Sequence, residues 1–281
     1  MNIFITGASS GIGRALAHEY AKRYLLSTSE NSVPASRMVI GSQGIPCNIG
    51  LVARRINELE ILAEELQQKY KVICAIYALD VRNAAALEAA AQDFMQQHGT
   101  PDIVIANAGV SRGTLTADKE DLAAFQAIFD INVQGMVHTF QPFIAAMKAA
   151  KQGQLVGVAS VAGIRGLPGA GAYSASKAAV ISYCESLRVE MARDNIAVTT
   201  IAPGYIRTSM TAVNEYKMPF LMDVGVFAHK FANAVAAKRR FVVIPWQMGW
   251  LARFMRFIPP FLWDFAMKNA PQKKRMNWDW L

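Results

Sequence analysis

Short apolar runs alternate with longer segments of helical periodicity along most of the chain. Runs rich in Ile, Val and Leu predict strands at residues 3–5, 49–53, 72–79, 102–106, 155–159, 196–201 and 241–244. Apolar positions three or four apart predict helices at residues 12–24, 56–70, 83–98, 118–147 and 173–193. Strands that alternate with helices predict an α/β fold with a parallel sheet.

Two stretches depart from this alternation. Residues 25–48 are rich in Ser, Asn, Gly and Pro and show no sustained period, which predicts a loop insertion. Within it, residues 38–40 are a weaker candidate for the second strand than residues 49–53, which an immediate helix pattern follows. Beyond Pro245, residues 246–281 form a tail dense in aromatic and basic side chains. We therefore expect one domain over residues 1–245 and an appended tail.

Composition agrees with one large α/β domain. Of the 281 residues, 53% are hydrophobic, which is enough to fill a sizeable core. The three cysteines and four histidines show no paired or ligand-like spacing, so we expect a reducing, cytoplasmic setting and no metal site. Met1 leads directly into an apolar strand, so no signal peptide is expected, and no apolar run is long enough for a membrane span.

Almost all of the net charge of +8 lies in the C-terminal part of the chain, in the tail and just before the last strand. Residues 238–281 hold nine Lys or Arg and two Asp, which is +7. No nucleic-acid-binding motif accompanies these charges, so no nucleic-acid partner is expected. Basic, tryptophan-rich helices suit association with a membrane surface, and they equally suit packing on the protein itself or on a second subunit. The sequence leaves both alternatives open.

A glycine-rich turn follows the first strand. Gly7, Gly11 and Gly13 let the backbone turn tightly before the helix at residues 12–24. A helix N-terminus offers amide donors and a positive dipole end to a phosphate. The position of this turn in a strand–helix–strand unit predicts a dinucleotide site.

Tyr173 and Lys177 are four residues apart on a predicted helix, so their side chains lie on one face. At about 4 Å and an effective dielectric of about 20, their attraction is roughly 4 kcal/mol in favour of the phenolate. We expect Lys177 to lower the pKa of Tyr173 and make it an acid/base. A surface tyrosine one turn from a lysine is the simpler alternative. Ser160, at the end of a strand, could hold a carbonyl oxygen beside the tyrosine.

Residues 6–13 resemble the TGxxxGxG turn of the short-chain dehydrogenase/reductase family, and further motifs of that family follow in order over residues 1–245. The family usually has an asparagine where this chain has Ala106. The resemblance implies a single-domain Rossmann fold with a doubly wound parallel sheet in the order 3-2-1-4-5-6-7. It also implies a homodimer or homotetramer that associates through the helices carrying Asn132 and Tyr173.

The resemblance also implies an activity, which is reversible hydride transfer between a nicotinamide and a carbonyl or secondary alcohol. Tyr173 would exchange the proton, Lys177 would bind the nicotinamide ribose, and Ser160 would polarise the carbonyl. Asn132 would bend its helix and complete a proton relay, whereas the residues alone indicate only a buried asparagine that needs hydrogen-bond partners. No metal is needed for this chemistry.

The resemblance implies that the cofactor lies against residues that follow the first six predicted strands. These positions are Gly7, Ser9, Ser10, Gly11, Ile12, Gly13, Asp80, Val81, Asn107, Ala108, Gly109, Tyr173, Lys177, Pro203, Gly204, Ile206 and Thr208. Arg54 and Arg55 end the second strand, where a carboxylate would favour NAD(H), and Arg14 lies near the glycines. Arginines can neutralise a 2′-phosphate, so we expect NADP(H), with NAD(H) as the alternative.

The substrate is expected to be an apolar carbonyl or alcohol. Residues 209–223 occupy the position of a substrate lid and are mostly apolar or aromatic, including Met210, Tyr216 and Phe220. Ordinary packing explains the same pattern equally well. An NAD-preferring alcohol dehydrogenase, and a non-catalytic cofactor-binding scaffold tethered by its basic tail, are the competing hypotheses.

Overall fold

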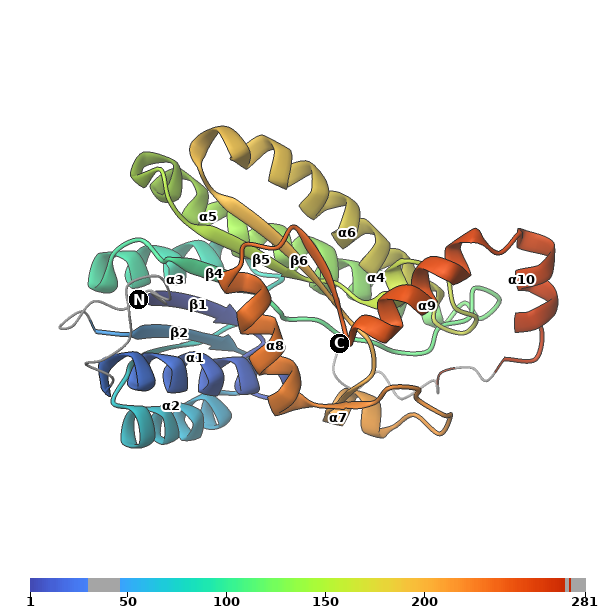
Figure 1. Cartoon of the computed structure of the whole chain (residues 1–281), viewed down its shortest axis with the longest axis horizontal. Helices are drawn as coiled ribbons and strands as arrows, with labels where there is room; N and C mark the ends of the chain where they lie inside the picture. The colour runs from blue at the N-terminus through green and yellow to red at the C-terminus, as the bar shows by residue number, and fades with distance from the viewer. Residues whose placement is uncertain (30–45, 271–272, 274–281) are drawn as a thin grey trace.

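The computed structural model describes residues 1–29, 46–270 and 273, which form a helix-covered parallel sheet (Figure 1). The sheet has seven strands in the order β3-β2-β1-β4-β5-β6-β9, with neighbouring strands parallel. The strands are β1 Asn2–Thr6, β2 Asn48–Ala53, β3 Ile73–Ala78, β4 Ile103–Ala106, β5 Gln154–Val158, β6 Ala197–Pro203 and β9 Phe241–Ile244. Since β9 is the seventh strand of the sheet, the predicted Rossmann order is confirmed.

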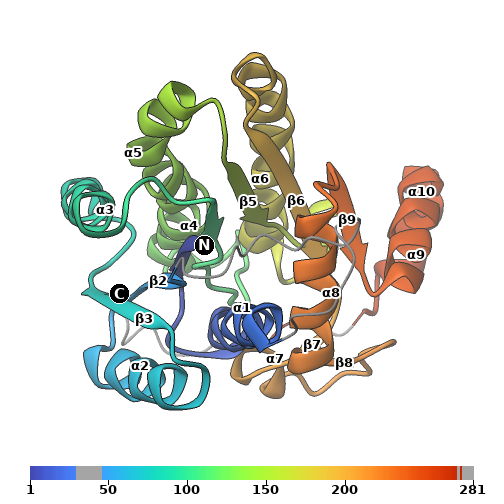
Figure 2. The ribbon, with the colours of Figure 1, turned by 60° about the vertical axis from the view of Figure 1, so that its left-hand side comes forward.

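Helices cover both faces of the sheet (Figure 2). One face packs against α1 Gly11–Ser29, α2 Ile56–Tyr70 and α8 Val224–Ala236. The other face packs against α3 Ala84–His98, α5 Gly135–Ala150 and α6 Gly171–Met191. Alternate residues of β1 show why: Ile3 and Ile5 join the first core, and Phe4 joins the second. Gly50 of β2 pairs with Phe4 and leaves space for its ring, since a Cβ there would lie 2.5 Å from Phe4.

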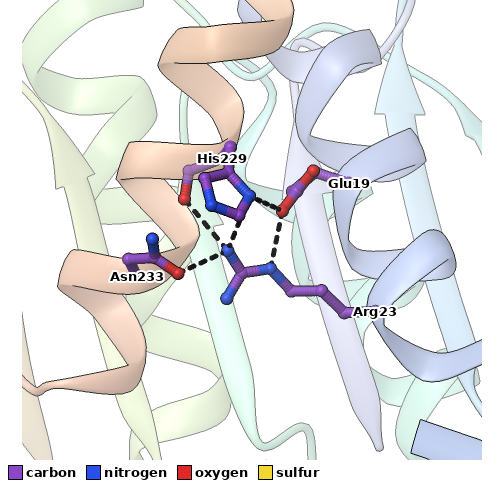
Figure 3. A network of polar contacts seen from close by, with 4 residues as sticks. All are labelled: Glu19, Arg23, His229 and Asn233. Carbon is purple, nitrogen blue, oxygen red and sulfur yellow. Dashed lines mark hydrogen bonds and ion pairs between the residues drawn. The ribbon is translucent and has the colours of Figure 1, made fainter. Parts of the chain in front are cut away.

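A polar network ties α8 to α1 at the edge of the first layer (Figure 3). Arg23 Nε donates to Glu19 at 2.7 Å, and Arg23 Nη2 donates to Asn233 Oδ1 at 2.7 Å and to the His229 carbonyl at 3.0 Å. His229 Nδ1 lies 2.9 Å from the same Glu19 carboxylate. These contacts hold α8 beside the helix that begins at the glycine turn.

The predicted bounds of the loop at residues 25–48 are wrong at both ends. Helix α1 continues to Ser29, because Leu25 packs on the core and the hydroxyls of Ser27 and Thr28 donate to carbonyls one turn back. Strand β2 begins at Asn48, so the second strand was placed correctly. Residues 30–45, including the weaker strand candidate at 38–40, lie outside the described residues.

The helix predicted at residues 118–147 is three segments. These are α4 Asp121–Phe129, a π-helical turn at Asp130–Gln134, and α5 Gly135–Ala150. Asn132 lies in the π turn, so the helix is distorted where the resemblance implies a bend. Such turns occur often at functional sites, because they redirect a side chain without ending the helix.

After β6, the chain forms the segments that border the open end of the sheet. These are β7 Ile206–Arg207, α7 Ser209–Ala212 and β8 Met222–Asp223, with β7 and β8 paired. The tail forms α9 Trp246–Phe257 and α10 Pro260–Met267, separated at Pro259. Over the described part of the chain, no helix combines the length and apolar character that crossing a bilayer requires.

Candidate functional site

A cavity of about 340 Å³ opens at the carboxyl ends of the parallel strands. Open α/β sheets bind ligands at this edge. All but three of the predicted site residues line it, namely Gly7, Ser9, Ser10, Gly11, Ile12, Arg54, Arg55, Asp80, Val81, Asn107, Ala108, Gly109, Ser160, Tyr173, Lys177, Pro203, Gly204, Ile206 and Thr208. Residues from six strand ends therefore meet in one space.

The three exceptions are Gly13, Asn132 and Arg14. Gly13 and Asn132 lie outside the lining and contact residues that belong to it. Arg14 faces away, because its guanidinium forms a two-pronged hydrogen bond with Glu65 of α2 at 2.7 and 2.8 Å. Its expected part in holding a 2′-phosphate has no support in this geometry, since carboxylates already neutralise the charge.

The turn between β1 and α1 depends on close backbone contacts. Gly7 adopts φ 71°, in the left-handed region that side chains disfavour. At Gly13, a Cβ would lie 2.2 Å from the Gly7 carbonyl oxygen. The first turn of α1 therefore packs directly on the strand end, and its amide groups face the cavity edge. This arrangement fits a bound phosphate.

Two arginines and an aspartate line the cavity beyond that turn. Arg55 Nη2 donates to Ser9 Oγ at 3.1 Å, and Arg54 Nη1 lies 3.9 Å from Asp80 Oδ2. Burial alone would raise the pKa of Asp80, but hydrogen bonds from Arg82 and the charges of Arg82 and Arg54 outweigh it and lower the pKa. The carboxylate therefore stays ionised beside a basic rim.

Ser160 and Tyr173 form a hydrogen-bonded pair at the other end. Ser160 Oγ also accepts the Ala162 amide at 3.1 Å, which fixes the hydroxyl at the end of β5. Desolvation raises the pKa of Tyr173 above its usual 10, and the hydrogen bond with Ser160 lowers it in part. The pair directs a phenol and a hydroxyl toward the same point in the cavity.

Lys177 lies one helical turn after Tyr173, with its Nζ 5.9 Å from the ring centre. Burial lowers the pKa of its ammonium to about 8. The Nζ donates to the Val158 carbonyl at 2.9 Å rather than to the phenol. The pKa of Tyr173 is therefore raised rather than lowered in this arrangement, because burial of the phenol dominates and the ammonium is directed to the Val158 carbonyl.

Asn132 is fully buried, and its amide is satisfied on both sides. Oδ1 accepts the Val110 amide at 2.8 Å, while Nδ2 donates to the Val110 carbonyl and to Ser176 Oγ, both at 3.0 Å. The side chain thus fixes the segment after β4 to the helix that carries Tyr173. A buried asparagine in need of partners was predicted, and these are the partners.

Sequence reasoning missed several residues of the site. Val110, Thr211 and Ser209 line the cavity, and Lys273 of the tail lies 5.7 Å from the Tyr173 ring centre. Ser176 could have been found, because it lies three residues after Tyr173 on the same helix face. Lys273 carries no local signal, since only the fold brings it here. No group of three potential metal ligands occurs within the described ranges.

Comparisons with known proteins agree with this geometry. Residues 35–218 match the family model described as short chain dehydrogenase. An uncharacterized oxidoreductase of Myxococcus xanthus is 34% identical over 94% of this chain and 95% of its own. A dehydrogenase/reductase SDR family protein 7-like of Anopheles gambiae is 30% identical over 96% of this chain and 83% of its own. Among solved structures, a short-chain dehydrogenase from Sphingobium yanoikuyae in complex with NADPH covers 98% of both chains at a TM-score of 0.72 and 21% identity, which shows the shared fold.

Proposed function

Because this chain belongs to the short-chain dehydrogenase/reductase family, we propose that it transfers hydride reversibly between NADP(H) and a carbonyl compound or secondary alcohol. One observation carries the proposal. The hydrogen-bonded Ser160–Tyr173 pair lies in the same cavity as the glycine turn, with Lys177 one turn further along the helix.

The chain's own residues account for the proton chemistry. A bound dihydronicotinamide would supply the hydride to the carbonyl carbon. The Tyr173 hydroxyl would give its proton to the carbonyl oxygen, and the Ser160 hydroxyl would hold that oxygen by a second hydrogen bond. The buried Lys177 ammonium would offset charge on the phenolate that results. In the alcohol-oxidising direction, each proton moves the opposite way.

The basic rim supports NADP(H) over NAD(H). Arg54 and Arg55 follow β2, where the ribose of a bound dinucleotide would lie, and Asp80 lies beside them. An additional phosphate would gain attraction from two guanidinium groups, whereas a plain ribose carries no charge for them to bind.

We also propose that the substrate is apolar and that two parts of the chain have different roles. Residues 1–245 would bind the cofactor and perform the chemistry, and the tail would border the substrate. Met210 lines the cavity, and Tyr205 packs edge-on against Tyr216 at 6.2 Å between ring centres. A panel of carbonyl compounds of rising apolar area tests this, because kcat/KM should rise with that area.

The outer face of the tail helices supports peripheral association with an anionic membrane. Three basic residues, Arg253, Arg256 and Lys268, are exposed on or just after these helices. The exposed aromatic side chains are Trp246, Trp250, Phe254, Phe257, Phe261 and Phe265. Apolar burial and attraction to anionic lipid act together at such a surface. Cosedimentation with vesicles containing phosphatidylserine should occur and should weaken in Phe257→Asp, while vesicles without anionic lipid should bind less.

Exposed apolar side chains on α4 and α6 support a homodimer or homotetramer. Leu122 is 72% exposed and Val189 66%, on the helices that flank Asn132 and carry Tyr173. Light scattering on the purified protein tests this, and a monomer would show that these helix faces stay in solvent.

The three free cysteines suit a reducing compartment, so we propose a cytoplasmic location, which fractionation of cells would test.

Substitution of Tyr173 by Phe tests the proposed activity. The variant keeps the ring and its packing but loses the proton that the carbonyl oxygen needs. We expect carbonyl reduction to fall by about 10²- to 10⁴-fold, with NADPH affinity nearly unchanged. Turnover that survives in Tyr173→Phe would overturn the role given to this residue.

A further inference from the structure

The tail returns to the substrate end of the cavity through a set of specific contacts. Arg165, in the segment after β5, stacks 4.8 Å from the Trp263 ring centre and donates to the Arg256 carbonyl at 3.3 Å. Arg256 Nη1 donates in return to the Ile164 carbonyl at 3.0 Å. These contacts fix α9 and α10 to the segment that leads from Ser160 to Tyr173.

Lys273 follows these helices and reaches the site itself. Its Nζ donates to Ser111 Oγ at 2.6 Å and lies 5.7 Å from the Tyr173 ring centre. Lys177 lies 5.9 Å from the same ring centre. Asn132 holds Val110, the residue before Ser111, through two hydrogen bonds, so the hydroxyl that meets Lys273 has a fixed position.

The Lys273 ammonium lacks an acidic partner among the described residues. Lys273 is partly buried, and its ammonium forms no ion pair with any carboxylate in the described ranges. Desolvation, and then the charge of Arg112, lower its pKa to about 8, so the ammonium is still mostly protonated at neutral pH. Cations removed from water are normally paired, because an unpaired one loses solvation without recovering it.

We propose that Lys273 and Ser111 form a subsite for a carboxylate carried by the carbonyl substrate, within a few bonds of the carbonyl. The proposal rests on the proposed function and narrows its substrate class. Lys273 supplies the charge, Ser111 a hydroxyl donor, and Arg112 adds positive potential to the same place. An apolar body then lies against Met210 and the tyrosines, while the acidic group anchors the molecule beside Tyr173.

A matched pair of probes tests the subsite, namely benzoylformate and its methyl ester, with NADPH consumption as the readout. The pair differs only in the charged group. In the wild-type protein we expect a higher kcat/KM for the acid. Lys273→Met should lower kcat/KM for the acid by roughly 10- to 100-fold, mostly through KM, and change that of the ester by less than about threefold. Lys273→Arg, which keeps the charge, should retain most of the preference.

Lys230→Met is the matched control, because Lys230 is an exposed lysine of α8 that does not line the cavity. It should behave like the wild type. Equal losses for acid and ester in Lys273→Met, or a wild-type protein that reduces the ester and not the acid, would overturn the subsite and leave the proposed function standing. A wild-type protein that binds NADPH and reduces neither probe, nor any other carbonyl of a wider panel, would overturn the proposed function and the subsite with it.

Discussion

At the proposed cofactor end of the cavity, around Gly11, Arg54 and Asp80, the lining residues come from the ends of adjacent parallel strands and the turn after β1. At the proposed substrate end, around Ser160 and Tyr173, the walls come from the end of β5, the first part of α6 and residues 206–211, and Lys273 of the C-terminal tail lies nearby. The sheet therefore sets the first end. The second end depends on contacts between distant parts of the chain, such as Ser111 and Lys273, which are 162 positions apart.

The difference has a physical consequence. Residues at the ends of hydrogen-bonded strands keep their relative positions as long as the sheet is folded. Residues contributed by a tail keep theirs only while the tail stays packed. Changes in the tail should therefore alter substrate use without altering cofactor binding, and changes in the glycine turn should do the opposite.

The largest effect should come from Gly13→Ala at the cofactor end. Its Cβ would lie 2.2 Å from the Gly7 carbonyl oxygen, so the turn must shift. Overpacking of this kind costs about 1–3 kcal/mol, which predicts NADPH affinity roughly 10- to 100-fold weaker by calorimetry. Gly225→Ala is the control, since nothing lies within 4 Å of a Cβ there. Equal affinities in the two variants would contradict the close packing inferred for the turn.

A smaller effect should follow truncation after Ile258, which removes α10 and Lys273. The Arg165–Trp263 stack and the Lys273–Ser111 hydrogen bond are lost together. We expect kcat/KM for acidic carbonyl substrates to fall about tenfold or more, while NADPH affinity changes less than about twofold. Trp263→Ala in the full chain removes the stack alone, so its kcat/KM for these substrates should lie between the values of the truncated and the full-length protein. A matching loss of NADPH affinity on truncation would show that the two ends are not independent.

The pH dependence of stability should reveal Lys177, which lies between the two ends. Its pKa is about 8 when folded and near 10.5 when unfolded, so the unfolded state holds more protons between these values. The free energy of unfolding should therefore rise with pH over pH 8–10 in the wild type, relative to Lys177→Met, by up to about 1 kcal/mol per pH unit. Denaturant unfolding at each pH measures this. Parallel pH curves for the two proteins would mean that the ammonium is not desolvated.

The smallest effect should come from Arg23→Ala, which breaks the network between α1 and α8 (Figure 3). These contacts are partly buried at the edge of the fold, so we expect a loss of about 1 kcal/mol in the free energy of unfolding. Lys22→Ala, an exposed neighbour, should cost less. NADPH affinity and kcat/KM should stay within about twofold in both. A large change in either constant would indicate that α8 helps to shape the cavity.

The sequence predicted the cofactor end more completely than the substrate end. The glycine turn at Gly7 was predicted from its place after an apolar strand, and the family resemblance added Asp80 and Asn107; strand ends in a parallel sheet meet at one edge, which brings all three together. Arg14, which was predicted to lie near the cofactor, binds Glu65 instead of lining the cavity. Its partner Glu65 belongs to α2, and no pattern near Arg14 indicates which helix will lie beside it.

The errors at the substrate end have a common cause. The pKa of Tyr173 depends on how deeply the helix is buried, which helical spacing does not reveal. Lys273 reaches Ser111 only because α9 and α10 pack on the segment after β5. The extension of α1 to Ser29 is of the same kind, since Leu25 becomes favourable in a helix once the core is there to receive it.

The most direct test of the proposed activity is a fluorescence titration of the purified protein with NADPH and with NADH in parallel. We expect NADPH to bind at least about tenfold more tightly, because Arg54 and Arg55 would pair with the extra phosphate. In Arg54→Ala and Arg55→Ala, that preference should shrink through weaker NADPH binding. Binding of neither nucleotide, or equal binding of both, would contradict an NADP(H)-dependent oxidoreductase.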